Sequence, residues 1–377
     1  MINILSFAFI GLLVFYFIFI RNIRIGLTKL GYFKTQSQID EFISIIIPFR
    51  NESDNIERNL KSIESQNYPA DKYEVIYIDD FSTDDSSDKL NNGITLKNIF
   101  VHSMVDNSFE KAHKKQAIEY GISKAKGTII LFTDADCTNS PDWIATMVAG
   151  FEKETALISG PVAFAESDSL FGKLQALEFA GLILSGAGLI GNGNPMIASS
   201  ANLAFRKSVF EDVGGYKDLM NLSSGDDELL MQKIAYKTKY DVKFCFSKDA
   251  LVITDPNKSI KEFNQQRKRW ASKGLFYENK SIIIQLVFIF LFFISLLILP
   301  FLGIFLDSKF WIQFAVSLFV KIIVEYAVLQ NGIGILFKRL SLNIFLLAEL
   351  IHIPYIAYSA ISGTFGNFKW KDRELKR

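Results

Sequence analysis

The sequence predicts an α/β domain, in which helices cover a mostly parallel sheet, placed between apolar segments that are long enough to cross a membrane. Short β-branched runs alternate with helical segments between residues 40 and 275. Two of these runs end in carboxylates. Long apolar runs precede and follow the middle part, so we divide the 377-residue chain into segments 1–39, 40–275 and 276–377.

Composition and charge exclude several classes of protein. Forty-one Lys+Arg against 40 Asp+Glu give a net charge of +1, so the electrostatic signature of nucleic-acid binding is missing. A hydrophobic content of 49% excludes a disordered chain. Two Cys without a CxxC and three His argue against a disulfide framework and against Cys/His metal sites. Any metal would therefore bind to carboxylates.

The N-terminal run, residues 2–20, carries no charge and is long enough for a membrane span. Arg21, Arg24 and Lys29 follow it, so the positive-inside rule places the next residues in the cytoplasm. A cleaved signal peptide is the alternative, but no Lys or Arg precedes the run and no A-x-A site follows it. We expect an integral protein of the cell (inner) membrane with a cytoplasmic middle domain.

Three apolar runs follow the middle domain, at residues 282–306, 310–330 and 342–362. Lys321 and Glu325 lie four residues apart in the second run and are expected to pair on one helix face. Three full spans would place the tail KWKDRELKR outside, although its five Lys/Arg favour the cytoplasm. We therefore expect a cytoplasmic tail and interpret the third run as re-entrant or interfacial.

Within the middle domain, four strands and three helices can be placed. The predicted strands are Ile43–Pro48, Glu74–Asp79, Asn98–Val101 and Thr128–Thr133, and the predicted helices are Ser53–Gln66, Lys111–Lys124 and one that begins at Pro141 after a Ser140 cap. Ligands bind at the carboxyl ends of strands in open α/β sheets. Asp79-Asp80 and Asp134/Asp136, which end two of the strands, should thus meet in one cleft.

Three short motifs carry chemistry, and each also has an ordinary structural interpretation. Asp134 and Asp136 could hold Mg²⁺ or Mn²⁺, or form an acidic turn with a helix cap. In Gly225–Glu228, a carboxylate could act as a general base or merely stabilise a helix N-terminus. The cluster Gln265–Trp270 could stabilise a leaving diphosphate and pack on a sugar ring, or face anionic lipid beside the membrane.

Other sequence features give weaker evidence of a functional site. Gly186–Gly191 matches G-x-G-x-x-G, but no strand precedes it, so we reject a dinucleotide site and expect a membrane-surface helix over 174–190. His102, His113 and His352 are isolated in sequence, and we expect them to be structural. Cys137 has no partner for nucleophilic chemistry in the sequence and is interpreted as a packing residue.

Taken together and in this order, these residues resemble the family 2 glycosyltransferases, the membrane-anchored relatives of cellulose, chitin and hyaluronan synthases, over residues 40–275. The segment Ile47–Glu52, which includes Pro48, Arg50 and Glu52, resembles the family's first-strand signature at the nucleotide. Asp80 matches the uracil-binding aspartate, and Lys114 matches the lysine of G-K-x-x-A, with His113 in place of the Gly. The remaining matches are Asp134 and Asp136 of D-x-D, Asn202 in the donor-sugar segment 199–206, Asp227 of E-D with Asp226 in place of the Glu, and Gln266, Arg269 and Trp270 of Q-x-x-R-W.

The resemblance implies an A-type glycosyltransferase fold and inversion at the anomeric carbon of a nucleotide-diphosphate sugar, which we expect to be UDP-linked. Mg²⁺ or Mn²⁺ on Asp136 and Asp134 would bridge the diphosphate, Asp227 would deprotonate the acceptor, and Arg269 with Lys114 would stabilise the leaving group. The acceptor would be lipid-linked or a polysaccharide. A processive synthase and a non-catalytic nucleotide-sugar-binding protein remain the alternatives, and a homo-oligomer stays open. The sequence names neither the sugar nor the acceptor.

Overall fold

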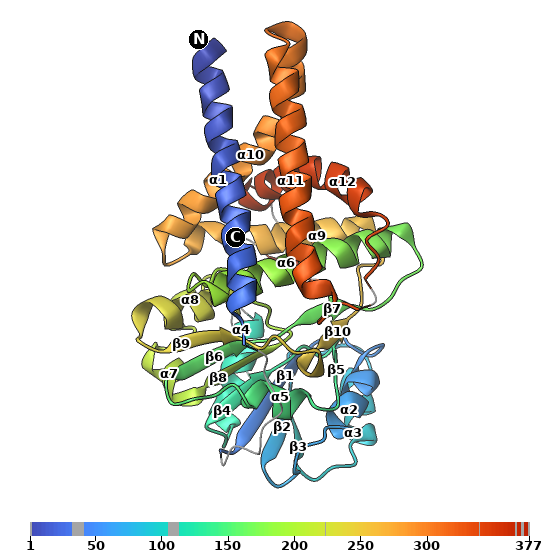
Figure 1. The fold of residues 1–377 in the computed structure, drawn as a ribbon. Helices are drawn as coiled ribbons and strands as arrows, with labels where there is room; N and C mark the ends of the chain where they lie inside the picture. The colour runs from blue at the N-terminus through green and yellow to red at the C-terminus, as the bar shows by residue number, and fades with distance from the viewer. Residues whose placement is uncertain are drawn as a thin grey trace.

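The computed structural model describes residues 2–31, 41–104, 113–222, 224–338, 340–365, 368–370 and 373–375. Figure 1 shows a sheet domain at one end and α1 (Ile2–Lys29) and α11 (Lys309–Ile333) standing away from it as long helices. Two helices, α6 (Leu170–Gly191) and α9 (Ile260–Ala271), lie across the boundary between the two regions (Figure 1). The expected boundary at residues 39 and 40 and the expected helix start at Lys111 lie outside the described residues.

The main sheet has seven strands in the order β3-β2-β1-β4-β8-β6-β9. Its first four strands are parallel neighbours, and they match the four predicted strands: β1 (Ile43–Phe49), β2 (Tyr73–Asp79), β3 (Ile99–Ser103) and β4 (Ile129–Phe132). All residues of β1, β2 and β4 are buried, as expected when helices cover both faces. The antiparallel strand β8 (Leu203–Arg206) pairs with β4 and with β6 (Thr155–Ser159), and β9 (Asp241–Phe244) runs parallel to β6.

The remaining elements complete the domain around this sheet. A second, three-stranded sheet joins β5 (Thr138–Asn139), β10 (Val252–Thr254) and β7 (Val162–Phe164). The short helices are α2 (Ile56–Glu64), α3 (Ser86–Gly93), α4 (His113–Lys124), α5 (Trp143–Val148), α7 (Lys207–Asp212) and α8 (Glu228–Lys237).

Two of the predicted helix starts are wrong. Helix α2 begins at Ile56 rather than after Ser53, because Ser53 Oγ accepts from Lys89 Nζ (3.2 Å) and residues 52–55 form a turn. Helix α5 begins at Trp143, because the Ser140 hydroxyl donates to the Asp249 carbonyl oxygen instead of capping the helix. In both cases a tertiary hydrogen bond uses the group that the local pattern assigned to a cap.

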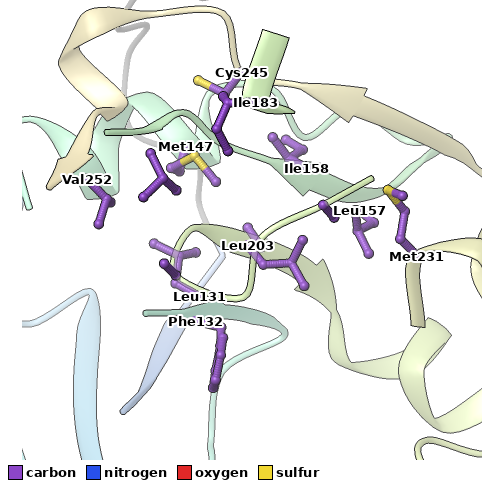
Figure 2. Close-up of a cluster of buried hydrophobic side chains, with 14 of the residues drawn as sticks. Leu131, Phe132, Met147, Leu157, Ile158, Ile183, Leu203, Met231, Cys245 and Val252 are labelled. Carbon is purple, nitrogen blue, oxygen red and sulfur yellow. The ribbon is translucent and has the colours of Figure 1, made fainter. Parts of the chain in front are cut away.

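The core extends from the sheet to the helices at the membrane side. Figure 2 shows Leu131 and Phe132 of β4, Leu157 of β6 and Leu203 of β8 packed near Ile183 of α6. These side chains are at most 6% exposed. Helix α6 is therefore part of the hydrophobic core of the sheet domain.

Five helices are long and apolar enough to cross a membrane: α1, α6, α10 (Lys280–Phe305), α11 and α12 (Phe345–Phe365). Four of them contain the apolar runs predicted from the sequence. The fifth, α6, is mostly buried and contacts α1, α11 and α12. Its place across the base of the upright helices in Figure 1 suits a membrane-surface helix.

Glycines of the rejected G-x-G-x-x-G motif allow α6 to cross α1 at very short range. A Cβ atom at Gly188 would lie 2.3 Å from the Ile23 carbonyl oxygen, and one at Gly191 would lie 2.3 Å from that of Gly26. Small residues at such crossings let helix backbones approach each other. The motif thus has a role in helix packing.

A buried polar cluster fastens α11 to α1 and α12. Lys321 Nζ lies 3.0 Å from Glu325 Oε1, which confirms the predicted pair, and also donates to Glu349. The Tyr16 hydroxyl of α1 donates to Glu325. His352 Nδ1 lies 3.7 Å from Glu325 Oε2, so this histidine, isolated in the sequence, belongs to a polar cluster between helices, in line with its expected structural role. Sequence distance hid the contact, because α12 folds back onto the Lys321 face of α11.

The ends of the helices give their directions. Lys309 Nζ donates to Asn3 Oδ1 (3.1 Å), so α1 and α11 begin at the same end, far from the sheet. At the other end of α11, Gly332 lies against Leu184 of α6. The last described strands, β11 (Phe368–Trp370) and β12 (Arg373–Leu375), form a hairpin, and β11 contacts α9.

Candidate active site

A cavity of about 730 Å³ opens at the carboxyl ends of β1 and β4 and is closed on the membrane side by α6, α9, α10 and α12. Eleven of the twelve predicted site residues line it: Pro48, Arg50, Glu52, Asp80, Lys114, Asp134, Asp136, Asp227, Gln266, Arg269 and Trp270. Segments up to about 220 residues apart in the chain therefore meet in one place, as expected for the edge of an open α/β sheet.

The twelfth residue, Asn202, lies behind the wall of the cavity. Its side chain is fully buried, donates to the carbonyl oxygens of Pro161 (2.9 Å) and Ala250 (2.7 Å), and accepts from Trp143 Nε1 (2.9 Å). Because these bonds use both donors and the acceptor oxygen, Asn202 is placed to hold the donor-sugar segment in shape. Its predicted direct contact with a ligand has no support in this geometry.

Two turns shape the end of the cavity nearest β1 and β2. Asn51 and Phe81 have positive φ values of 50° and 57°, which L-residues adopt only where the surroundings hold them. Arg50 Nη1 donates to the Asp80 carbonyl oxygen (2.7 Å), and this bond ties the two turns together. Glu52 accepts from Asn55 Nδ2 (2.9 Å), and its own N–H donates to Ser86 Oγ (2.7 Å).

The centre of the cavity holds a lysine between carboxylates. Lys114 Nζ lies 2.6 Å from Asp134 Oδ1 and 3.2 Å from Asp226 Oδ2, and it donates to Ser200 Oγ (2.8 Å). Burial by itself lowers the pKa of Lys114, but the two carboxylates outweigh it and the pKa is raised. Burial also raises the pKa of Asp134, although Lys114 opposes this shift. The lysine thus neutralises a group of acids that would otherwise repel one another.

The turn before α8 presents two adjacent acids in different directions. Gly225, with φ of 92°, supports this turn. Asp227 accepts from the Glu228 N–H (2.7 Å) and from the Ser200 N–H (3.2 Å), so it is Asp227 that caps the helix. The Asp226 side chain instead faces Lys114, 3.2 Å away. Burial raises the pKa of Asp226, but the positive charges of Lys114, Lys115 and Lys273 outweigh burial, so the pKa is lowered overall.

Sequence reasoning missed Lys273, which is buried beside this turn. Its Nζ lies 3.1 Å from Asp227 Oδ1 and 3.2 Å from Glu228 Oε2. Glu228 also accepts from the Tyr277 hydroxyl (2.7 Å), and burial raises the pKa of Glu228 to about 7. The one available signal was the place of Lys273 just beyond the Gln266–Trp270 motif.

Helix α9 brings this motif to the cavity. Arg269 lines the cavity, and its charge is among those that lower the pKa of Asp226. Gln266 accepts from Asn257 Nδ2 (2.9 Å). Trp270 stacks near Phe179 of α6, with ring centroids 5.9 Å apart, and Arg267 lies 4.3 Å over its ring. Arg267 also forms a buried ion pair with Glu178 of α6, so the basic cluster contributes largely to the packing of α9 against α6.

Cys137 is buried beside the acidic loop, as its interpretation as a packing residue required. Its Sγ lies 3.4 Å from Asp136 Oδ1, and burial raises the pKa of its thiol well above the ordinary value. The thiol therefore stays protonated, and a nucleophilic role has no support.

The sheet domain is similar in sequence to known proteins. Residues 44–214 match the sequence profile described as glycosyl transferase family 2. Glycosyltransferase AglE of Haloferax volcanii is 29% identical over 187 residues, which cover 49% of this chain and 59% of that protein. The poly-beta-1,6-N-acetyl-D-glucosamine synthase of Staphylococcus epidermidis is 27% identical over 249 residues, which cover 64% of this chain and 56% of that protein. The chain thus spans less than two thirds of the length of these curated relatives.

A solved structure shares the fold. The mannosyltransferase PcManGT of Pyrobaculum calidifontis, in complex with GDP-Man and Mn²⁺, superposes with a TM-score of 0.59 over 96% of this chain and 97% of that one, at 18% identity. Together with the strand order of the sheet, this likeness confirms the predicted A-type fold with apolar helices before and after the sheet domain.

Proposed function

From the premise that this chain carries a glycosyl transferase family 2 domain, we propose that it transfers a sugar from a nucleotide-diphosphate donor to an acceptor at the membrane face. The observation that carries this proposal is the convergence of Asp134, Asp136, Lys114, Asp227 and Arg269 on one cavity beside apolar helices. We place the catalytic unit at residues 40–275, between segments 1–39 and 276–377.

The donor is proposed to lie with its base near Glu52 and Asp80 and with its diphosphate toward Asp134. The turns after β1 and β2, which Arg50 ties together, form the end of the cavity that suits a flat base and a ribose. The match of Asp80 to a uracil-binding aspartate favours UDP. Screening a panel of nucleotide sugars identifies the donor, because only the accepted one releases nucleoside diphosphate.

Asp134 and Asp136 suit a divalent metal. Both line the cavity and offer the oxygen ligands that Mg²⁺ and Mn²⁺ prefer. Lys114 Nζ lies 2.6 Å from Asp134 Oδ1, so a metal would share this carboxylate with the lysine or take its place. A metal bound there would neutralise the charge that develops on the donor diphosphate.

Asp227 is proposed as the general base. It would accept the proton of an acceptor hydroxyl, whose oxygen attacks the anomeric carbon from the face opposite the diphosphate and inverts it. Lys273, 3.1 Å away, keeps the base oriented, as do the Glu228 and Ser200 N–H groups. Arg269 and Lys114 stand where they would stabilise the departing diphosphate. Asp226 is a poorer base, since its lowered pKa weakens its affinity for a proton.

The helix directions support a topology with a cytoplasmic sheet domain. Helices α1 and α11 run toward that domain, and the domain-side end of α11 meets α6. Helix α12 begins beside Tyr326, seven residues before the end of α11, and ends beside Ala271 of α9. Seven helical residues measure about 10 Å, so both ends of α12 lie in the domain-side part of the membrane region. We propose that α12 is re-entrant and that the tail is cytoplasmic.

Metal removal tests the enzymatic proposal directly. The purified protein, with its accepted donor, should lose turnover in EDTA and regain it with Mg²⁺ or Mn²⁺. Asp136→Ala should not be rescued by either metal. Full turnover in chelator would contradict the proposed metal site, and the absence of turnover with any donor would favour a nucleotide-sugar-binding protein without activity.

A further inference from the structure

The cavity does not end at the acidic residues but continues between the membrane-side helices. Beyond Asp227 and Trp270 its wall consists of apolar side chains from three helices, α6, α10 and α12. The main ones are Leu182, Ile183, Leu286, Ile289, Phe290 and Ile356. Along α10 the lining runs from Ile283 to Phe290, which is about 10 Å of helix, and we call this part the apolar arm.

The apolar arm opens toward the region that lipid would occupy. Val287 of α10 and Ile361 of α12 both line the cavity, yet they are 47% and 50% exposed, respectively. They therefore mark its rim. Helices α10 and α12 are both apolar enough for a membrane, so the rim faces acyl chains when the protein is inserted. At the inner end, Gly363 lets α12 approach α9, because a Cβ there would lie 2.4 Å from that of Ala271.

This wall suits a hydrocarbon chain better than a glycan. A sugar chain placed against aliphatic side chains would lose hydrogen bonds to water without replacing them. Two of the three hydroxyl groups from α12 that line the cavity are already engaged: the Tyr355 hydroxyl donates to Glu178 Oε1 (3.2 Å), and Thr364 Oγ1 donates to the Ala360 carbonyl oxygen (2.8 Å), whereas the buried Ser359 Oγ has no hydrogen-bond partner among the described residues. An alkyl chain, in contrast, gains about 0.8 kcal/mol for each methylene buried.

Charge at the inner end of the arm indicates the head group. The charged residues that line the cavity comprise five cations and eight acids: Arg50, Lys114, Arg267, Arg269 and Lys273, against Glu52, Asp80, Asp134, Asp136, Glu178, Asp226, Asp227 and Glu228. Three of the cations already pair with acids of this set. A divalent metal would be balanced by the donor diphosphate. An anionic acceptor would thus meet an acidic surface, whereas an uncharged hydroxyl would not.

We propose that the acceptor is a lipid with an uncharged, hydroxyl-bearing head group, whose chain lies in the apolar arm and whose hydroxyl reaches Asp227. This inference rests on the proposed function and specifies its acceptor. The acceptor oxygen bonds to the anomeric carbon, the bond from that carbon to the diphosphate oxygen breaks, and its electron pair leaves with the nucleoside diphosphate. The hydroxyl proton passes to Asp227.

A series of acceptors tests the proposal. The whole protein, in lipid nanodiscs with its accepted donor, is offered hexyl, octyl and decyl glucoside below their critical micelle concentrations. A soluble glucose oligomer and decyl phosphate are offered in parallel. If the chain lies in the arm, KM falls with each added methylene by up to about fourfold, the equivalent of 0.8 kcal/mol, until the arm is full. Decyl phosphate and the soluble oligomer should be poor acceptors.

A variant locates the chain. Ala360 lines the arm and touches none of the proposed catalytic groups, so Ala360→Phe should shorten the arm. We expect it to raise KM for decyl glucoside at least tenfold. The control is Leu350→Phe on the same helix, which is 57% exposed and lies outside the cavity lining. It should leave this KM as in the wild type.

Each remaining outcome decides the question. Equal KM values across the alkyl series, or preference for the soluble oligomer, would overturn the lipid acceptor while leaving the glycosyltransferase intact. Preference for decyl phosphate would overturn the uncharged head group. If the wild-type protein released no nucleoside diphosphate with any acceptor or with water, the proposed function itself would be refuted, and the inference with it. The alkyl series uses wild-type protein, so misfolding of Ala360→Phe would not leave the proposal undecided.

Discussion

Replacing Asp227 by Asn is the sharpest test of the mechanism, because Asn keeps the shape of the side chain but cannot accept a proton at neutral pH. The carboxylate accepts from the Glu228 N–H and Lys273 on one oxygen and from the Ser200 N–H on the other. The amide NH₂ must face one of these donors, so one hydrogen bond is lost. That loss costs about 1–3 kcal/mol of stability. Loss of a general base costs about 10²–10⁴ in kcat, or about 2.7–5.4 kcal/mol in the barrier.

The assay measures nucleoside diphosphate release at saturating donor, together with donor affinity by calorimetry and the thermal midpoint. We expect kcat to fall by at least a hundredfold while donor affinity stays within a few-fold, since the donor is held elsewhere in the cavity. Asp226→Asn is the comparison: it removes one partner of Lys114, 3.2 Å away, and should lower donor affinity and stability more than kcat. Near-normal kcat in Asp227→Asn with an inactive Asp226→Asn would reassign the base, and two active variants would refute both assignments.

Three further predictions concern stability and topology. Lys321→Met removes the lysine that pairs with Glu349 and Glu325 and should lower the free energy of unfolding by about 3–5 kcal/mol. Lys309→Met, at the exposed end of α11, is the control and should change this free energy little. Equal thermal midpoints for the two variants would contradict the prediction. Burial raises the pKa of Glu228 from 4.5 to about 7, so the folded protein binds this proton more tightly than the unfolded chain does. Protonated Glu228 therefore stabilises the fold by about 3 kcal/mol below pH 4.5, and this stabilisation is lost as the pH rises to 7. Glu228→Gln should flatten that part of the curve of thermal midpoint against pH, and an unchanged slope would remove Glu228 as its source. A reporter fused after the tail should respond as cytoplasmic, and a signal from the other side would make α12 a full span.

Much of the sheet domain could be predicted because its pattern is local. Strands β1, β2 and β4 are short runs of β-branched residues that are buried on both faces, and their carboxyl ends carry the acids of the site. Strands β6, β8 and β9 were missed, because β8 runs antiparallel between β4 and β6, a pairing with distant partners that no local pattern indicates. Helices α2 and α5 begin later than predicted because tertiary hydrogen bonds use the side chains of their expected caps.

The partners of the site residues could not be predicted. Lys114 meets Asp226 across 112 positions of sequence, and Lys273 meets Asp227 across 46, with no periodicity to indicate either pair. Arg267 looked like a surface cation of a basic patch, yet it is 3% exposed and pairs with Glu178. Motifs identify side chains with chemistry, but the fold decides which of them are paired with one another and which face the cavity.

The close crossing of α1 and α6 makes the N-terminal helix part of the packing that shapes the cavity. Helix α6 contributes Phe179 and Ile183 to the cavity wall, and its far side fits against α1 through Gly188 and Gly191. A fragment starting at residue 41 would therefore lack the α1 backbone that packs against Gly188 and Gly191, and this surface of α6 would be open to detergent or to a second copy. Deleting α1 would thus change the packing of α6 and, with it, the shape of the cavity.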